Sequence, residues 1–287
     1  MVLKFSKYCS ILLGICALTH AWTYSEQDQW PEEFPKCGSN HQSPIAISSM
    51  EADNKTYPRI DYEYYGNALE VTITNNGHTA LIKLSNNAVK PRISRGPLPA
   101  NETYEFDSLL FHWGANNSLG SEHVLNDHRF SVEVQAVHYN TKYKNFDEAI
   151  QHSDGVAILT AFYQTNPFQR LTALNDVTNA LFSIVEYESS TKISDFKLSG
   201  IYGGIDKPSK SVYYTYAGSL TTPPCSETVT WIIFPIAVFV APYQLKPFRM
   251  LMDKNGEELV NNFRKLQDLN GRKILINRSG YGIYRNV

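Results

Sequence analysis

Short segments in which apolar and polar residues alternate are the main pattern of this chain. The alternation is regular over residues 68–74 and 130–137 and looser over residues 79–84. Successive side chains of a β-strand point to opposite faces, so the alternation predicts strands with one buried face. Asn76-Gly77 separates two of these segments and predicts a hairpin turn between them.

Other segments predict buried strands and a few helices. Residues 156–162 and 230–240 are almost continuously apolar, as is typical of strands that are buried on both faces. One helix is predicted over residues 171–185, and a second over residues 244–252, after Pro242. The apolar face of the first consists of Leu174, Val177, Leu181 and Ile184. No internal repeat or low-complexity linker divides the sequence, which favours a strand-rich domain with a few peripheral helices.

Composition narrows the classes of function. The 287 residues are 43% hydrophobic and carry a formal net charge of −2. Such a chain is long enough for one large domain or two small ones. The nearly neutral balance provides no basic field for nucleic acid and no acidic tail, so we expect no nucleic-acid partner.

The beginning of the sequence predicts a secretory signal peptide. Lys4 and Lys7 precede an apolar run over residues 11–18, and small residues follow up to Ala21. A membrane anchor is the alternative, but the run is far shorter than the about 20 apolar residues that span a bilayer. We expect cleavage after Ala21 and secretion of the rest into the extracellular space, with no membrane span and no lipid-anchor signal at residues 280–287.

Cysteines and glycosylation sequons fit that destination. Cleavage would remove Cys9 and Cys16 and leave Cys37 and Cys225, so a single pairing is possible, two free thiols being the alternative. Four Asn-x-Ser/Thr sequons are candidates for glycosylation, of which we expect only some to be used. They begin at Asn54, Asn101, Asn116 and Asn277.

Two motifs carry the chemistry. Leu110-Phe111-His112-Trp113-Gly114 is followed about twenty residues later by Glu133-Val134-Gln135-Ala136-Val137-His138. They resemble the metal-binding core of the α-carbonic anhydrases, which reads His-x-His-Trp-Gly and Glu-x-His-x-x-His. The resemblance places the three zinc ligands of that family on Leu110, His112 and Gln135.

The resemblance runs from about Trp22 to the end of the chain through an ordered set of further motifs. They are Gln42-Ser43-Pro44-Ile45, Asn75-Asn76-Gly77-His78, Gly120-Ser121-Glu122-His123, the segment 218–224, Val229-Thr230-Trp231 and Asn262-Phe263-Arg264. It implies one domain over residues 22–287 of the α+β class, β-dominated, built on a large twisted, mostly antiparallel sheet with peripheral helices. It also implies a Cys37–Cys225 disulfide, because secreted members join cysteines at the corresponding places.

The ligand positions decide what the resemblance implies for activity. Residues i and i+2 of a strand share a face, so residue 110 projects beside His112 and Gln135 projects toward them from a neighbouring strand. Three imidazoles there would hold Zn²⁺ and leave one position for the water that attacks carbon dioxide. Leu110 has no lone pair, and the neutral amide oxygen of Gln135 is a poor substitute for imidazole. We expect no bound zinc, no other cofactor and no catalysis.

The resemblance also assigns roles to the surroundings of that position. Thr221 and Glu122 would orient a zinc-bound hydroxide and His78 would shuttle protons, while Glu133 and Ser108 stand where residues supporting the ligands are found. Without a metal we expect His112 to be a hydrogen-bonded buried imidazole, His78 a rim histidine, and Glu122 and Thr221 a hydrogen-bonded pair. An apolar wall for carbon dioxide would consist of Val137, Ile158, Leu220 and Trp231, which are equally residues of a core.

Three hypotheses of function remain at this point. The first is a secreted carbonic anhydrase-related protein that has lost its zinc site and acts as a binding or scaffold module for unidentified extracellular proteins. The alternative is an enzyme with weak carbon dioxide hydration or esterase activity, using a non-standard metal held by His112, Gln135 and a third group. A carrier of small molecules in the vacated cavity is a third reading.

Overall fold

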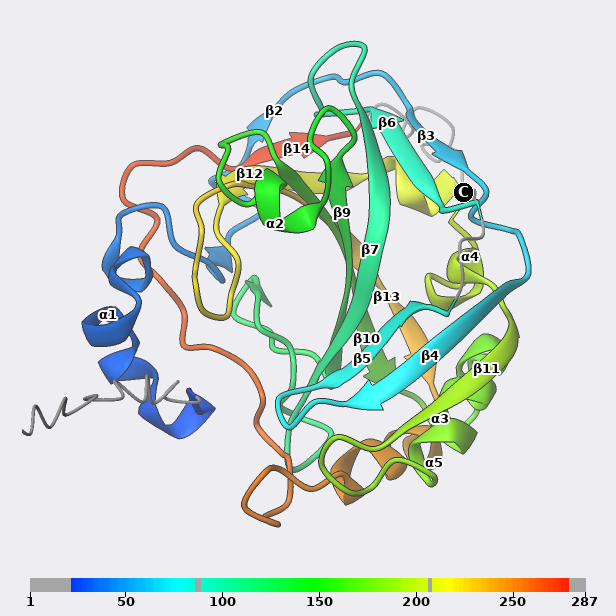
Figure 1. Cartoon of the computed structure of the whole chain (residues 1–287). Coiled ribbons are helices and arrows are strands. Elements are labelled where there is room, and N and C mark those ends of the chain that lie inside the picture. The colour runs from blue at the N-terminus through cyan, green and yellow to red at the C-terminus, as the bar shows by residue number, and fades with distance from the viewer. Residues whose placement is uncertain (1–21, 86–88, 206–207, 279–287) are drawn as a thin grey trace, which may run out of the picture.

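A computed structural model describes residues 22–85, 89–205 and 208–278 of the chain. Its main element is a 12-stranded twisted sheet in which most neighbouring strands are antiparallel. The main path of the sheet runs β11-β4-β5-β7-β9-β10-β13-β12-β14-β2 (Figure 1), with β3 and β6 attached beside β7. The predicted fold class, a β-dominated α+β domain on one large sheet, is confirmed.

The strands are β1 Ala46–Ile47, β2 Asp53–Asn54, β3 Ile60–Glu63, β4 Leu69–Asn75, β5 Ala80–Leu84, β6 Arg92–Arg95, β7 Thr103–Trp113, β8 Val124–Leu125, β9 Val132–Asn140, β10 Val156–Thr165, β11 Ser190–Phe196, β12 Tyr213–Gly218, β13 Val229–Val240 and β14 Leu275–Asn277. The α-helices are α1 Trp30–Glu33, α2 Phe146–Ala149, α3 Asn175–Leu181, α4 Leu198–Ile201 and α5 Pro242–Leu245. The 3₁₀ helices are η1 Tyr24–Gln29, η2 Pro35–Gly38, η3 Thr172–Leu174, η4 Pro208–Ser211 and η5 Pro247–Met250.

Both faces of the central strands are buried, and alternate residues enter two different cores. On β9, Val134 and Ala136 join the larger core, which packs under α3, α4 and α5, whereas Val137 joins a second core on the opposite face. The same division holds on β13, where Ile232 belongs to the first core and Trp231 to the second. The period of two in the sequence therefore sorts residues between two buried layers.

The candidate site belongs to the second face. β7 and β9 are antiparallel neighbours, with Leu110 opposite Gln135 and His112 opposite Glu133. These four residues lie in the middle of the sheet, flanked by β5 on one side and β10 on the other. Long paired strands hold them, so their positions are fixed by the sheet and not by loops.

The predicted hairpin after the first alternating segment is present and carries His78 at its tip. β4 and β5 pair in antiparallel fashion up to Asn75 and Ala80. Gly77 adopts a φ of 79°, a left-handed conformation that favours glycine. The side-chain oxygen of Asn76 accepts hydrogen bonds from the backbone N–H groups of His78 and Thr79. Local turn chemistry thus presents His78 at the end of the sheet.

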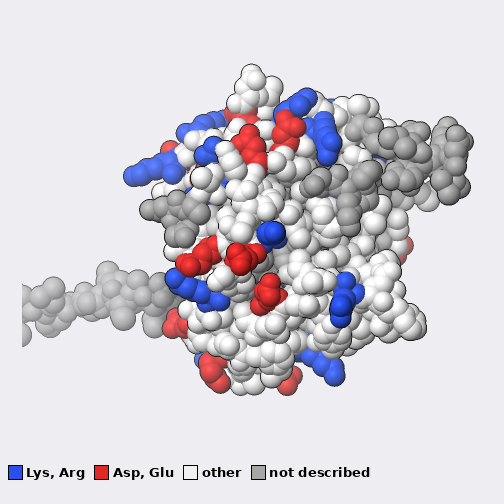
Figure 2. Space-filling model, turned by 90° about the vertical axis from the view of Figure 1, so that its right-hand side faces the viewer, with Lys and Arg blue, Asp and Glu red and all other residues white. Residues whose placement is uncertain are grey.

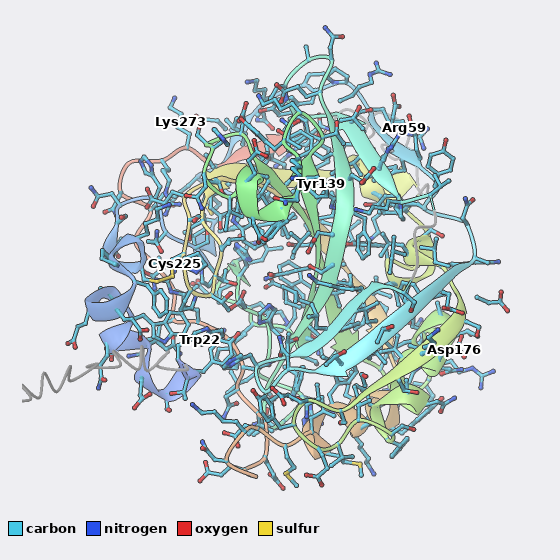
Figure 3. All side chains as sticks on the ribbon, in the orientation of Figure 1. Trp22, Arg59, Tyr139, Asp176, Cys225 and Lys273 are labelled. Carbon is cyan, nitrogen blue, oxygen red and sulfur yellow. A yellow bond between two sulfur atoms is a disulfide. The ribbon has the colours of Figure 1, made fainter. Side chains whose placement is uncertain are left out.

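The segment before β1 is tied to distant parts of the chain. Cys37 and Cys225 form a disulfide that closes a loop with a sequence separation of 188 residues, which confirms the predicted pairing. The bond is buried in a small cluster with Trp30. Cys225 and Trp22 lie on the same side of the sheet as the N-terminal helices (Figure 3), while the predicted cleavage after Ala21 falls outside the described residues.

Two predicted helices are present in part, and their predicted lengths are wrong. The predicted apolar face over residues 171–185 is fully buried, but η3 forms its beginning and α3 ends at Leu181. The predicted helix over residues 244–252 is divided into α5 and η5 at Pro247, which has no N–H to donate and crowds the preceding turn.

The surface of the molecule agrees with the nearly neutral composition. Figure 2 shows lysine and arginine groups interspersed with aspartate and glutamate groups, and the described residues of that face form no continuous patch of one sign. Among the residues with described positions, no helix has both the length and the apolar composition needed to cross a bilayer.

Removal of the disulfide should lower the stability of the fold. In the chain-entropy estimate, opening a loop with a separation of 188 residues costs about 5 kcal/mol. We expect Cys37→Ala with Cys225→Ala to lower the melting temperature of the purified protein strongly in a thermal scan. An unchanged melting temperature would show that packing around Trp30 alone holds this region.

Stability should also fall with acid through His138. Its ring is fully buried, its Nδ1–H donates to the carbonyl of Ala136, and the hydroxyl of Tyr65 donates to its Nε2. Burial lowers the pKa of His138 from 6.5 to about 3, so the unfolded chain binds a proton here before the folded one does. Stability from this group is present above pH 6.5 and is lost as the pH falls toward 3, by roughly 5 kcal/mol in full.

Urea unfolding at pH 7 and pH 4.5 tests this expectation. His138→Gln should lose less free energy of unfolding over that interval than the unsubstituted protein. His128 is exposed, so His128→Gln should lose as much as the unsubstituted protein. Equal losses in the two variants would contradict the role given to His138.

Candidate functional site

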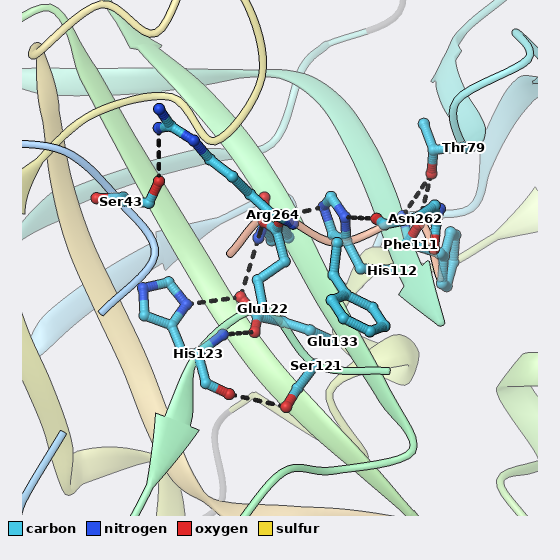
Figure 4. A network of polar contacts seen from close by, with 12 residues as sticks. Ser43, Thr79, Phe111, His112, Ser121, Glu122, His123, Glu133, Asn262 and Arg264 are labelled. Atoms are coloured by element: carbon cyan, nitrogen blue, oxygen red, sulfur yellow. Dashed lines mark hydrogen bonds and ion pairs between the residues drawn. The ribbon is translucent and has the colours of Figure 1, made fainter. Parts of the chain in front are cut away.

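The site is centred on His112, in the middle of the second face of the sheet. The imidazole is 1% exposed, and its Nδ1–H donates to the backbone carbonyl of Asn262 at 2.8 Å. Its other nitrogen, Nε2, has no hydrogen-bond partner among the described residues and lies 3.5 Å from Oε2 of Glu122 (Figure 4). The ring therefore directs Nε2 toward a carboxylate.

Asn262 fixes the orientation of this histidine. Its side-chain oxygen accepts from the backbone N–H of Trp113, and its amide nitrogen donates to the carbonyls of Phe111 and His78. One asparagine thus clamps the end of β7 and joins it to the β4–β5 hairpin. The hydrogen bond from His112 Nδ1–H to the Asn262 carbonyl sets the orientation of the imidazole ring.

Gln135 joins two buried carboxylates. Its Nε2 donates to Oε2 of Glu122 at 2.8 Å and to Oε1 of Glu133 at 2.9 Å. Gln135 is 1% exposed, and both glutamates are fully buried. Both hydrogens of the amide are used in this way, so the amide neutralises in part the repulsion between two acceptors that have left water.

Glu133 belongs to a buried chain of hydrogen bonds. It accepts from the backbone N–H and from Nδ1 of His123, both at 2.8 Å. Nε2 of His123 bonds to the hydroxyl of Tyr216, which donates to Ser43. Burial raises the pKa of Glu133, but the charge and hydrogen bonds of His123 outweigh this and hold the pKa below its ordinary value. The carboxylate is therefore charged at neutral pH.

Glu122 and the Thr221 loop are held by different partners. The second oxygen of Glu122 accepts from the backbone N–H of Arg264 at 3.0 Å. Thr221 is buried, but no hydrogen bond joins it to Glu122 in the part of the chain that the structure describes. Instead of the expected pair, Glu122 bonds to Gln135 and Arg264, because the amide of Gln135 approaches it from the sheet.

Arg264 connects the site to the N-terminal region. Its guanidinium is buried and donates to the side chain of Gln42 and to the carbonyls of Ser43 and Cys37. Burial lowers the pKa of Arg264 to about 10, and Glu122 acts in the opposite direction. The group stays protonated at neutral pH and places a positive charge near Glu122.

His78 is covered by an N-terminal aromatic residue. The indole of Trp22 stacks on its imidazole, with ring centroids 3.8 Å apart and planes 13° apart. Burial and Lys254 lower the pKa of His78 to about 4, against a smaller effect of Asp253, so the ring is neutral at pH 7. Near it, burial and the charge of Glu122 raise the pKa of Tyr24 well above 10.

The remaining residues of the candidate set are distributed around the same face. Ser108 is buried on β7, opposite Val137. Val137, Ile158 and Trp231 are almost fully buried members of the second core, and Leu110 and Leu220 pack against it while keeping partial exposure. The predicted wall therefore exists as packed core, with only the two leucines open to the outside.

Sequence reasoning missed several partners that close this network. Tyr216 and Ser43 were not assigned a function, although they extend the Glu133–His123 chain. In the sequence, Trp22 marked only the start of the family resemblance. Its contact with His78 joins residues 56 positions apart, so no local pattern predicts the contact. The aromatic and hydroxyl side chains of these residues are common in cores, and only their spatial arrangement gives them a role.

Comparisons with known proteins agree with this geometry. A family model for eukaryotic-type carbonic anhydrases matches residues 25–278. The chain belongs to the carbonic anhydrase family. Carbonic anhydrase 7 of Mus musculus is 32% identical over 263 residues, which cover 89% of this chain and 96% of that protein. Carbonic anhydrase 6 of Bos taurus is 32% identical over 267 residues, 90% of this chain and 81% of that protein.

Within this carbonic anhydrase fold, the three positions that resemble the zinc ligands lie together as expected. Leu110 and Gln135 are cross-strand neighbours, and His112 is two residues along β7. Among the residues whose placement is described, no group of three or more histidine, cysteine, aspartate or glutamate side chains is arranged to hold a metal ion.

The bridging amide gives a prediction for stability. Gln135→Leu keeps a similar size but leaves Glu122 Oε2 and Glu133 Oε1 without that donor, which should cost about 3 kcal/mol or more for two hydrogen bonds to charged groups. Equilibrium urea unfolding measures the loss. Leu110→Met, a volume-conserving change at the opposite position, is the control and should cost less than about 1.5 kcal/mol. A Gln135→Leu variant as stable as the control would contradict the importance of the bridge.

Proposed function

We propose that this carbonic anhydrase homologue does not hold a catalytic zinc ion and acts, after secretion, as a binding or scaffold module. The observation that carries the proposal is the arrangement at the former ligand positions. Leu110 is aliphatic, and the amide nitrogen of Gln135 is turned toward Glu122 and Glu133 by two hydrogen bonds. Of these three positions, only His112 has a ring nitrogen, and its Nε2 has no hydrogen-bond partner among the described residues.

This donor set does not fit a tetrahedral zinc site. Such a site needs three or four nitrogen, sulfur or carboxylate ligands at about 2.0–2.3 Å. The next possible metal ligand near His112 is Glu122, whose Oε2 lies 3.5 Å from Nε2 of His112. Its carboxylate already accepts hydrogen bonds from Gln135 and from the backbone N–H of Arg264. A cation would compete with those two donors for the carboxylate, and a single imidazole nitrogen would stand beside it.

The loss of two ligands is large in energetic terms. If a structural zinc site is worth about 10–16 kcal/mol, each strong ligand accounts for about 3–5 kcal/mol. The absence of two would weaken binding on the order of 10⁴- to 10⁷-fold. No reaction step through a metal-bound water is therefore derived for this chain.

The intact fold supports a binding role. The sheet, the disulfide and the buried network around His112 preserve a rigid domain, and rigid scaffolds are suited to presenting surfaces to partners. The disulfide supports an oxidising compartment, in agreement with the predicted signal peptide at residues 1–21. The partners that we propose are extracellular proteins, which remain to be identified by pull-down from extracellular fluid.

Metal analysis and a hydration assay test the proposal together. Purified protein that has been dialysed and then re-exposed to zinc should contain far less than one zinc ion per chain. Its rate of carbon dioxide hydration should equal that of buffer, without sensitivity to a sulfonamide. Stoichiometric zinc with a sulfonamide-sensitive rate would instead establish the alternative, a weak enzyme with a non-standard metal site.

A double substitution provides the positive control. Leu110→His with Gln135→His restores three imidazoles on neighbouring strands, and it should bind zinc and recover some hydration activity. The single variants hold two imidazoles and should bind zinc less tightly than the double variant. A folded double variant that binds no zinc would show that the missing ligands are not the reason for the absence of metal.

A further inference from the structure

We propose that Asn54, Asn101 and Asn116 carry N-linked glycans and that the fourth sequon, at Asn277, does not. The inference rests on the secretion included in the proposed function. In the transfer, the asparagine amide nitrogen bonds to the anomeric carbon of an oligosaccharide carried on a lipid diphosphate. The bond from that carbon to the diphosphate oxygen breaks, the amide loses one proton, and the lipid diphosphate leaves.

Asn277 cannot accommodate a glycan in the folded protein. Its side chain is 1% exposed at the end of β14. Nδ2, the atom that a glycan would occupy, donates to the carbonyl of Ser211 at 2.7 Å, and Oδ1 accepts from the backbone N–H of Tyr57 at 3.1 Å. A sugar on Nδ2 would have to displace the residues packed around this buried side chain, and only one N–H of the amide would remain to donate.

Asn101 has the opposite environment. It is exposed in the tight connection between β6 and β7, where the backbone N–H of Glu102 bonds to the carbonyl of Pro99. Its φ of 64° is left-handed, a conformation that asparagine tolerates in turns. Within the described residues, none of the side-chain hydrogen bonds involves its amide, so Nδ2 is accessible.

Asn116 is exposed in the loop that follows β7, and its turn leaves the reactive atom available. Its side-chain oxygen accepts a hydrogen bond from the backbone N–H of Ser118 at 2.8 Å. This bond uses Oδ1 and folds the sequon so that the exposed Ser118 comes back toward the asparagine. Nδ2 of this exposed residue has no hydrogen-bond partner among the described residues.

Asn54 lies on the exposed edge of the sheet. β2 ends the strand order and pairs with β14 through Asn54 and Ile276, with no strand on its other side among those described. An open edge strand is a template for unwanted pairing with other chains. A glycan on the exposed Asn54 would cover that edge, so this modification has a structural use as well as an accessible site.

The three sites restrict where a protein partner can bind. β2 and the connection from β6 to β7 lie at the same end of the molecule (Figure 1), and Asn116 follows the opposite end of β7. Glycans there would cover both ends of that strand. A partner is therefore expected on a surface away from the β2 edge and the β6–β7 turn.

The test uses the full chain expressed in animal cells with its own leader. Protein recovered from the medium is treated with a glycan-releasing amidase in ¹⁸O-water, which converts each glycosylated asparagine to labelled aspartate, and its peptides are analysed by mass spectrometry. We expect label at residues 54, 101 and 116 and none at residue 277. Label at Asn277, or its absence from any of the other three, overturns the assignment at that position.

Matched variants give a second readout. Asn54→Gln, Asn101→Gln and Asn116→Gln should each remove one glycan-sized step in gel mobility, and Ser118→Ala should act like Asn116→Gln while leaving the asparagine in place. Asn277→Gln should remove no step but should lower the melting temperature, because it disturbs two buried hydrogen bonds.

Failure of this inference and failure of the proposed function are distinguishable. A chain that stays in the cytosol with its leader intact would overturn the glycan assignment and the secreted role, while zinc analysis of the same protein would still decide the metal question. Secreted chains without any glycan would overturn only the assignment made here.

Discussion

The structure of the site depends on one amide that lies between two buried carboxylates. Glu122 and Glu133 are both fully buried, and Gln135 donates one hydrogen to each of them. Two desolvated acceptors side by side are costly unless donors or cations compensate them. Here the compensation comes from Gln135, from His123 on one side and from the backbone of Arg264 on the other. Gln135, at a position that resembles a zinc ligand of the family, is thus part of the structural network.

Leu110 lies opposite Gln135 on the neighbouring strand. It packs against the second core beside Val137 and Trp231, so the corner that a third imidazole would occupy is apolar. His112 is the histidine among these three positions, and its Nδ1–H is held by the backbone carbonyl of Asn262. Leu110 and Gln135 at these two positions are therefore compatible with the intact fold of the family, and the 32% identity to carbonic anhydrase 7 extends over 89% of the chain.

How far the sequence could predict this differed between elements. Long strands with clear alternation, such as β4 and β9, were predicted with small errors at their ends, because a period of two and a buried face are local properties. β11 was not predicted, since its residues are mostly exposed and its strand form depends on pairing with β4. That Leu110, His112 and Gln135 lie together on neighbouring strands was expected from the family resemblance. The register that sets Leu110 opposite Gln135 and the hydrogen bonds of Glu122 with Gln135 and Arg264 required the structure. The stacking of Trp22 on His78 also required the structure, because it brings together residues that are far apart in the sequence.

The connections of Arg264 have a consequence for how the protein is made. A single guanidinium bonds to Cys37, Gln42 and Ser43, more than 200 residues earlier, and β2 pairs with β14 across a similar interval. During synthesis the early segments therefore emerge long before their partners exist. Folding dominated by such distant contacts is slow, and the partly made chain exposes unpaired strands. The segment from Cys37 to Asn54 therefore cannot reach its final position until nearly all of the domain has left the ribosome. Assistance from chaperones during translation should matter more for this segment than for one that makes only local contacts.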